Sequence, residues 1–292
     1  MKTSHLINGA VTAIALSMAA YHLYVVFFGV PSVFFFRGTH LLFSLILIFL
    51  IHPFRKSQSN TLSGNTLDAI FVLCSITCIA HIFINHDYIL NRFAYVDDLS
   101  ALDLTLGTGL ILLTLEATRR VIGLALPLTA TIFVTYALVI DQIDFGQLID
   151  QMYLTTEGIF GIPLNVSATY MVLFILFGAL VERSGTGKLF RDFSLALAGS
   201  SAGGPAKVAC VTSAMFGTVS GSSTANVMTT GTFTIPLMKK IGYRPAFSGA
   251  VEAVASTGGQ ILPPIMGAAA FVMAEMMAVS YITVISMAIV PA

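Results

Sequence analysis

Long apolar runs recur along the chain and constrain its fold more than any other feature. Six of them are long enough to cross a hydrocarbon core of about 30 Å as α-helices, namely 6–30, 33–51, 67–85, 101–118, 121–140 and 166–182. Only 10% of the residues are charged, whereas soluble domains carry about 25%. The sequence therefore predicts an all-α polytopic membrane protein and excludes an ordinary cytosolic enzyme.

The positions of Lys and Arg predict the orientation of the chain. With a cytoplasmic N-terminus, 12 of the 14 basic residues fall on the cytoplasmic side, and Arg37 and Arg92 fall outside. This agrees with the positive-inside rule, and the opposite orientation violates it. The 12 residues are Lys2, Arg55, Lys56, Arg119, Arg120, Arg183, Lys188, Arg191, Lys207, Lys239, Lys240 and Arg244.

This count requires residues 205–237 to enter and leave the membrane on the same side, because basic residues stand at both ends of the segment. The lengths agree with this requirement. As helices, Pro205–Val219 would be about 22 Å long and Asn226–Leu237 about 18 Å, so neither crosses the core. The sequence predicts a re-entrant helical hairpin whose tip is the polar run "SGSSTAN", residues 220–226.

The polar run at the hairpin tip is a candidate ion and substrate site. Irregular backbone inside a membrane is tolerated only where it is buried in protein or lines a wet cavity. Exposed carbonyls and hydroxyls suit Na⁺, and the N–H groups that begin the second half-helix suit an anion. The alternative is a close helix–helix interface, because Gly, Ser, Thr and Ala also let helices pack tightly.

A second break lies in "STGGQILPP", residues 256–264, within the apolar stretch 245–279. Pro263 and Pro264 remove two backbone donors, and a discontinuous helix is a further pointer to the binding site of a secondary transporter. The alternative is a Pro-kinked helix packed against its neighbours. Glu252 precedes the break by one to two turns and is a candidate coupling carboxylate, because intramembrane carboxylates are usually functional.

These two stretches, from "GTVSGSSTANVMTTG" to "STGGQILPPIMGAAAFVMAE", resemble the large membrane subunit (DctM-like) of TRAP transporters, the tripartite ATP-independent periplasmic transporters. The likeness is to the fused kind, in which a small four-helix subunit precedes the large one. Residues 1–120 would then be the small-subunit-like region, and 121–292 the first half of the large-subunit transport domain.

The resemblance implies a secondary active transporter and no enzyme. It would be a multi-pass permease of a bacterial or archaeal cytoplasmic (inner) membrane that imports organic acids, often carboxylates. Na⁺ would be the coupling ion, with no other cofactor, and a periplasmic binding protein of the TAXI type would deliver the substrate. The large subunit would move as an elevator, with an inverted repeat that carries a second hairpin and a second broken helix.

The resemblance also implies the site residues. The positions that match the hairpin tip are Ser220, Gly221, Ser222, Ser223 and Asn226. Those that match the break are Thr257, Gly258, Gly259, Pro263 and Pro264. Within this set, Ser220, Ser222 and Gly258 are the candidate Na⁺ ligands.

The resemblance implies that the second repeat of the family lies outside these 292 residues. We therefore expect this chain alone not to transport, because an elevator site needs both repeats. The alternative function is an incomplete, non-transporting fragment or scaffold that requires a second chain. The sequence identifies no substrate, and it has no Arg between residues 192 and 243 that could bind an anion.

Two further stretches carry weaker expectations. Phe34, Phe35 and Phe36 are typical of interfacial or lipid-facing aromatics. Residues 141–163 are expected as an external loop that lies on the membrane surface or touches a binding protein. Neither of these two alternatives is favoured by the residues of the loop.

Overall fold

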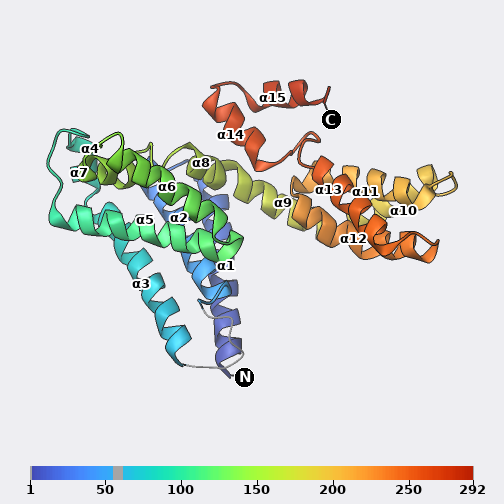
Figure 1. Ribbon diagram of the computed structural model, residues 1–292, viewed down its shortest axis with the longest axis horizontal. Coiled ribbons are helices and arrows are strands. Elements are labelled where there is room, and N and C mark those ends of the chain that lie inside the picture. The colour runs from blue at the N-terminus through green and yellow to red at the C-terminus, as the bar shows by residue number, and fades with distance from the viewer. Residues whose placement is uncertain (1, 55–61, 292) are drawn as a thin grey trace. The chain divides into compact units, whose positions relative to one another are not determined.

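The computed structural model describes residues 2–54 and 62–291, and within these ranges it contains helices and no strand (Figure 1). Arg55 and Lys56, two of the predicted cytoplasmic charges, lie outside the described residues. The chain divides into two compact units, Met1–Ala168 and Thr169–Ala292. The all-α polytopic fold predicted from the apolar runs is confirmed.

Unit 1 holds ten helical segments among its described residues. The long ones are α1 (Lys2–Phe28), α2 (Val33–Ile51), α3 (Leu62–Ile84), α5 (Ala101–Ile122) and α6 (Ala125–Val139). The short ones are α4 (His86–Asn91), α7 (Phe145–Ile149), the π-helix η1 (Asp150–Leu154), α8 (Ile162–Val166) and the π-helix η2 (Ser167–Met171), which runs past the unit boundary.

Five described helical stretches are long and apolar enough to cross a membrane. They are Asn8–Phe28, Val33–Ile51, Thr66–Ile84, Ala101–Ile122 and Ile162–Val181. The sixth predicted span, 121–140, is a shorter helix: α6 has 15 residues, about 22 Å. Gly123, with φ +98°, ends α5 inside the predicted span and leaves too few residues for a full crossing.

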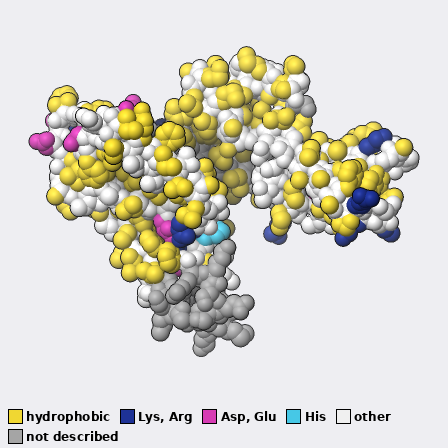
Figure 2. All heavy atoms as spheres, in the orientation of Figure 1, with side chains coloured by type: hydrophobic (Ala, Val, Ile, Leu, Met, Phe, Trp, Pro, Cys, Tyr) yellow, Lys and Arg dark blue, Asp and Glu magenta, His cyan; other side chains and the backbone are white. Residues whose placement is uncertain are grey.

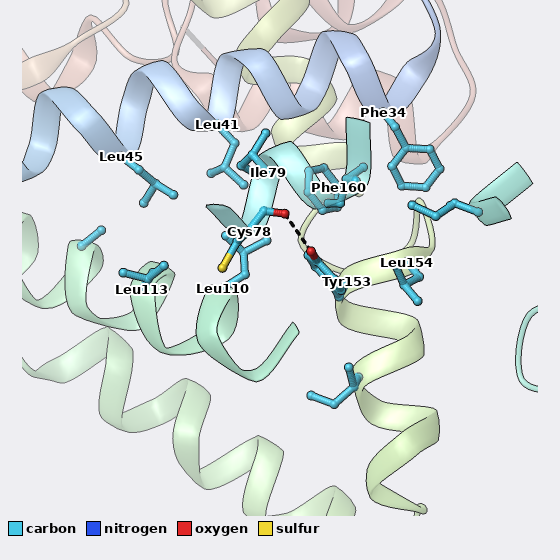
Figure 3. Close-up of a cluster of buried hydrophobic side chains, with 14 of the residues drawn as sticks. Phe34, Leu41, Leu45, Cys78, Ile79, Leu110, Leu113, Tyr153, Leu154 and Phe160 are labelled. Atoms are coloured by element: carbon cyan, nitrogen blue, oxygen red, sulfur yellow. Dashed lines mark hydrogen bonds between the residues drawn. The ribbon is translucent and has the colours of Figure 1, made fainter. Parts of the chain in front are cut away.

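The core of unit 1 lies between α2, α3, α5 and the segment that follows α6 (Figure 3). Leu45, Ile79 and Leu110 are fully or almost fully buried there. Ser100 begins α5 with a capping box, because its hydroxyl accepts from the backbone N–H of Asp103 and the Asp103 carboxylate accepts in return. The cap fixes the residue at which α5 begins, and α5 carries Leu110 into the core.

Within the segment 141–163, residues 148–161 contribute buried side chains to this core, whereas Asp141, Gln142 and Phe145 at its start are exposed. Tyr153 and Phe160 are fully buried, and the Tyr153 hydroxyl donates to the carbonyl of Cys78 at 2.7 Å (Figure 3). Burial raises the pKa of Tyr153, so its hydroxyl stays a neutral donor. The interpretation of Phe34–Phe36 is wrong for two of three residues, since Phe34 and Phe36 are buried against this segment and α1.

A buried ion pair anchors the same segment. The guanidinium of Arg92 binds both carboxylate oxygens of Asp150, one of them at 2.9 Å, and both side chains are 2% exposed. The backbone N–H of Tyr95 adds a third bond to Asp150 at 2.7 Å. Pairing of this kind is what permits two charges to be buried.

Unit 2 contains α9 (Val172–Arg183), α10 (Thr186–Ala198), α11 (Gly204–Ser220), α12 (Ser223–Lys240), α13 (Pro245–Gly258), α14 (Ala268–Met276) and α15 (Tyr281–Ala288). Helices α10 to α13 lie alongside one another (Figure 1). Most Lys and Arg side chains of this unit gather at one end of it (Figure 2). Lys207 lies in the first turn of α11, and Lys239 and Lys240 end α12. Because these two helices pack together and are joined by two residues, the three lysines lie at the same end, as a hairpin requires.

Candidate functional site

The hairpin tip is a two-residue joint between α11 and α12. α11 ends at Ser220, and Gly221 follows with φ +60°, a conformation that suits glycine. Ser222 then caps α12, because its hydroxyl accepts from the backbone N–H of Ala225 at 3.3 Å. The tip thus turns the chain back within the length of a single polar run.

The break between α13 and α14 is a nine-residue irregular segment. α13 ends at Gly258 and α14 begins at Ala268. The N–H of Gly267 donates to the carbonyl of Gln260 at 2.6 Å and closes the segment into a loop. Tyr281 of α15 donates its hydroxyl to the carbonyls of Pro264 and Ile265, and its ring stacks on Phe271 at 4.3 Å.

The tip and the break are interlocked through backbone contacts. A Cβ on Gly217 would lie 2.3 Å from the Cα of Gly259, and one on Gly221 would lie 2.0 Å from the carbonyl oxygen of Met266. The side chain of Gln260 donates to the Ser223 hydroxyl at 3.1 Å. Only residues without a side chain let the two irregular segments approach this closely.

A cavity of about 510 Å³ opens beside the interlocked segments. Its polar lining comes from Ser220, Ser222 and Gln260, and its apolar wall is built mainly from α9, α14 and the break. Among the residues described, the lining includes no charged side chain. A pocket of this size with a few converging polar groups is typical of a small-molecule site.

Behind the tip, a fully buried polar cluster surrounds Glu252 of α13. Its carboxylate accepts from the hydroxyls of Thr230 and Thr234 on α12, and from Ser213 of α11 and Ser256, both at 3.2 Å. Asn226 joins the cluster and donates from its amide to the backbone carbonyl of Ser213 at 2.8 Å. All these side chains are 0–1% exposed, so the cluster ties the hairpin to the broken helix.

The predicted site residues separate into four groups. Ser220, Gly221, Ser222, Ser223 and Gly259 lie at the junction of tip and break, and Asn226 lies in the cluster behind it. Thr257 is exposed and donates to Ala253 of its own helix, and a Cβ on Gly258 would meet nothing within 4 Å. Pro263 and Pro264 lie within the irregular segment, toward Tyr281.

Sequence reasoning missed the hydroxyls around Glu252. Asn226, Thr230 and Thr234 follow one another at four-residue spacing, as do Glu252 and Ser256, so each set lies on one face of its helix. A polar stripe on two apolar helices is a detectable signal, because it predicts that the two faces meet. The contact of Ser213 with both stripes has no such signal in the sequence.

A family model described as "Tripartite ATP-independent periplasmic transporter, DctM component" matches residues 110–292, more than half of the chain. The C4-dicarboxylate TRAP transporter large permease protein DctM of Pseudomonas aeruginosa is 35% identical over 91 residues, 31% of this chain and 21% of that protein. The isethionate TRAP transporter permease protein DctMQ of Oleidesulfovibrio alaskensis is 31% identical over 146 residues, 49% of this chain and 21% of that protein.

A third relative, the DctM protein of Vibrio cholerae, is 36% identical over 91 residues, 31% of this chain and 20% of that protein. The chain thus spans about a fifth of the length of the curated relatives it matches. No solved structure matches the chain. The family match covers α6, the hairpin and the broken helix together, and on that ground the chain belongs to the DctM component family of tripartite ATP-independent periplasmic transporters.

Proposed function

We propose that the chain is part of a secondary active transporter that couples Na⁺ to the import of organic acids. A periplasmic binding protein would deliver the substrate. The observation that carries this proposal is the interlocking of the hairpin tip with the helix break beside a cavity. Two discontinuous helices that meet in this way offer unpaired backbone groups to ions and anions, as secondary transporters require.

The chemistry of the junction fits an anion and a small cation. The first N–H groups of α12 point out of the helix end at the tip, where the helix dipole favours negative charge. The hydroxyls of Ser220 and Ser222 at the junction are hard oxygen ligands that suit Na⁺, as is the carbonyl of Gly258, which ends α13 one residue before the junction residue Gly259. We assign these three residues as candidate Na⁺ ligands and the junction as the substrate contact of this unit.

We further propose that the chain has the arrangement in which the small and large subunits are fused. Residues 1–120 would be the small-subunit-like region, and 121–292 would begin the large subunit and pair with a binding protein of the TAXI type. The match to a permease named DctMQ, which extends over more of this chain than the matches to the two DctM proteins, supports this proposal. The relatives' printed substrates, C4-dicarboxylate and isethionate, are organic anions and support the substrate class.

The test is uptake into proteoliposomes that contain the complete permease and its binding protein. We expect labelled organic acids to accumulate under an inward Na⁺ gradient and not under a choline gradient. Ser222→Ala should abolish most of this uptake. Because that change also removes a helix cap, Ser222→Gly is the companion variant, which lacks the hydroxyl at a cost of only a few tenths of a kcal/mol.

Ser286→Ala is the matched control, since Ser286 is exposed on α15 and donates to Thr283 of its own helix. Na⁺-independent uptake, or full activity in both Ser222 variants, would contradict the proposal. The alternative of an incomplete, non-transporting fragment or scaffold predicts that these 292 residues import nothing by themselves and that uptake needs a second chain. The family match does not favour that alternative.

A further inference from the structure

The buried cluster around Glu252 contains more oxygen than hydrogen bonding alone explains. The hydroxyl oxygen of Ser213 has four oxygen neighbours: Thr230, Glu252 and Ser256 at 3.2 Å each, and the amide oxygen of Asn226 at 3.4 Å. One hydroxyl carries one hydrogen, so it can donate to only one of these oxygens and has to accept from the hydroxyls among the others. These separations also exceed the range of about 2.5–3.0 Å that O–H···O bonds prefer.

The same separations suit oxygens that share a small, hard cation. Ligands at about 2.3–2.6 Å from a cation and at right angles to one another lie about 3.3–3.7 Å apart. Two further edges of the cluster have similar lengths: Ser256 to Glu252 is 3.2 Å, and Thr230 to the Asn226 amide oxygen is 3.2 Å. One pair differs, because the Thr230 hydroxyl donates directly to the Glu252 carboxylate in a short hydrogen bond. The other printed separations among the five oxygens are close to those of ligands on one side of a coordination shell.

The charge of the cluster also favours a bound cation. Glu252 is fully buried, and among the described residues no Lys, Arg or His forms an ion pair with it. The titratable side chains on the two helices packed against α13 are Lys207 and Cys210 of α11 and Lys239 and Lys240 of α12. Cys210 and the two α12 lysines are exposed, and Lys207 donates to Ser201.

Burying a single carboxylate without a cationic side chain costs free energy unless one positive charge balances it. No group of three or more His, Cys, Asp or Glu that could hold a metal ion occurs in the described ranges, and Glu252 is the only charged member of this cluster, so the ligand set lacks the charge that a divalent transition metal prefers. We propose that Glu252, with Ser213, Asn226, Thr230 and Ser256, binds one monovalent cation, separate from the hairpin-tip ligands Ser220 and Ser222. This rests on the proposed transport function, in which the site would add a coupling ion.

The site also explains how binding could act on the hairpin. Its ligands come from α11, α12 and α13, which are the three helices that carry the tip and the break. A cation at this point holds the two halves of the hairpin against the broken helix. Its release leaves the carboxylate as the only charge among neutral oxygens, so occupancy of this site and the closed arrangement of the tip favour each other.

The first experiment is equilibrium binding of ²²Na⁺ to the purified complete permease. We expect the wild type to bind one more Na⁺ than Glu252→Gln, or to bind that ion at least about tenfold more tightly, a loss seen even for residues that only support metal ligands. Thr230→Val should weaken the same ion. Thr232→Val is the matched control, because Thr232 is on the same helix but exposed and bonded to Thr229.

A proton is the other source of a single positive charge. It is identified if ²²Na⁺ binding is equal in wild type and Glu252→Gln, while an imposed pH gradient drives uptake by the wild type and Thr232→Val but not by Glu252→Gln. The site is overturned if Glu252→Gln and Thr230→Val match the wild type in both measurements. If Glu252→Gln fails to fold, Thr230→Val alone decides, because it preserves the shape and the carboxylate.

The binding assay separates this inference from the proposed function. If the permease binds the Glu252-dependent ion but imports nothing, the cation site stands and the proposed transport function is wrong. If Na⁺-driven uptake and ion binding are the same in the wild type and both cluster variants, the transport function stands and the cation site is wrong.

Discussion

Gly217 of α11 lies in backbone contact with Gly259 of the helix break, where a Cβ on Gly217 would come within 2.3 Å of the Gly259 Cα. This contact joins two segments that are 42 residues apart in sequence (259 − 217). It determines how the hairpin tip meets the broken helix, and it leaves no room for a side chain on either partner.

The first prediction concerns these close contacts. Gly217→Ala and Gly221→Ala should each lower the melting temperature and abolish Na⁺-driven uptake, because the new methyl group meets backbone and cannot be accommodated by a side-chain shift. Gly221 carries the additional cost of a left-handed conformation. The melting temperature can be followed by circular dichroism of the detergent-solubilised permease.

Gly249→Ala is the control for both variants. Gly249 lies in α13, and a Cβ there meets nothing within 4 Å, so the change should leave stability equal or raise it by about 0.5–1 kcal/mol. Equal stability of all three variants would mean that the tip and the break do not touch as described.

The second prediction concerns Asn226. Asn226→Ala removes the amide that bonds the Ser213 carbonyl at 2.8 Å and leaves a gap among buried polar groups. We expect a loss of about 1–3 kcal/mol in the free energy of unfolding. Asn91→Ala removes the same kind of bond, from an exposed amide to the Asp87 carbonyl at 2.8 Å, and should cost less than about 0.5 kcal/mol. Similar losses for the two variants would argue against a tightly packed cluster.

The third prediction concerns Tyr281. Tyr281→Phe keeps the ring that stacks on Phe271 and removes the donor to the carbonyls of Pro264 and Ile265. The expected cost is about 0.5–1.5 kcal/mol in stability, with a slower uptake because the break is less firmly held. Tyr136→Phe, at a tyrosine that is 48% exposed, serves as control. If uptake and melting are unchanged in Tyr281→Phe, α15 does not position the break.

The fourth prediction tests the buried ion pair of unit 1. Asp150→Ala leaves the guanidinium of Arg92 buried without its partner and should cost about 3–5 kcal/mol. Asp192→Ala removes one partner of an exposed pair and should change stability by no more than about 0.5 kcal/mol. The double variant Arg92→Met with Asp150→Leu should recover part of the loss. A double variant as unstable as Asp150→Ala would show that the charge of Arg92 is not the cause.

Much of the helical layout could be predicted because apolar runs and polar interruptions are local features. The run 33–51 coincides with α2, and the polar run 220–226 contains the joint between α11 and α12. The family match and the five apolar helices agree with a multi-pass inner-membrane protein. The cytoplasmic position of the N-terminus stays a prediction.

The burial of residues 148–161 could not be predicted in the same way. Its anchors are the pair of Arg92 with Asp150 and the bond of Tyr153 to Cys78, whose partners lie 58 and 75 residues apart. Each residue read alone suits an exposed loop or a membrane interface. Only the contact between distant parts of the chain shows that these polar groups are satisfied inside unit 1.

The sequence by itself determined that helices span a membrane and that two of them are interrupted, because hydrocarbon tolerates polar groups and prolines only under narrow conditions. The tertiary structure decided which interruptions meet and placed Glu252 among hydroxyls from three helices. The physical reason is that helical periodicity specifies which face of a helix is polar, whereas the partner of that face depends on packing across long sequence separations.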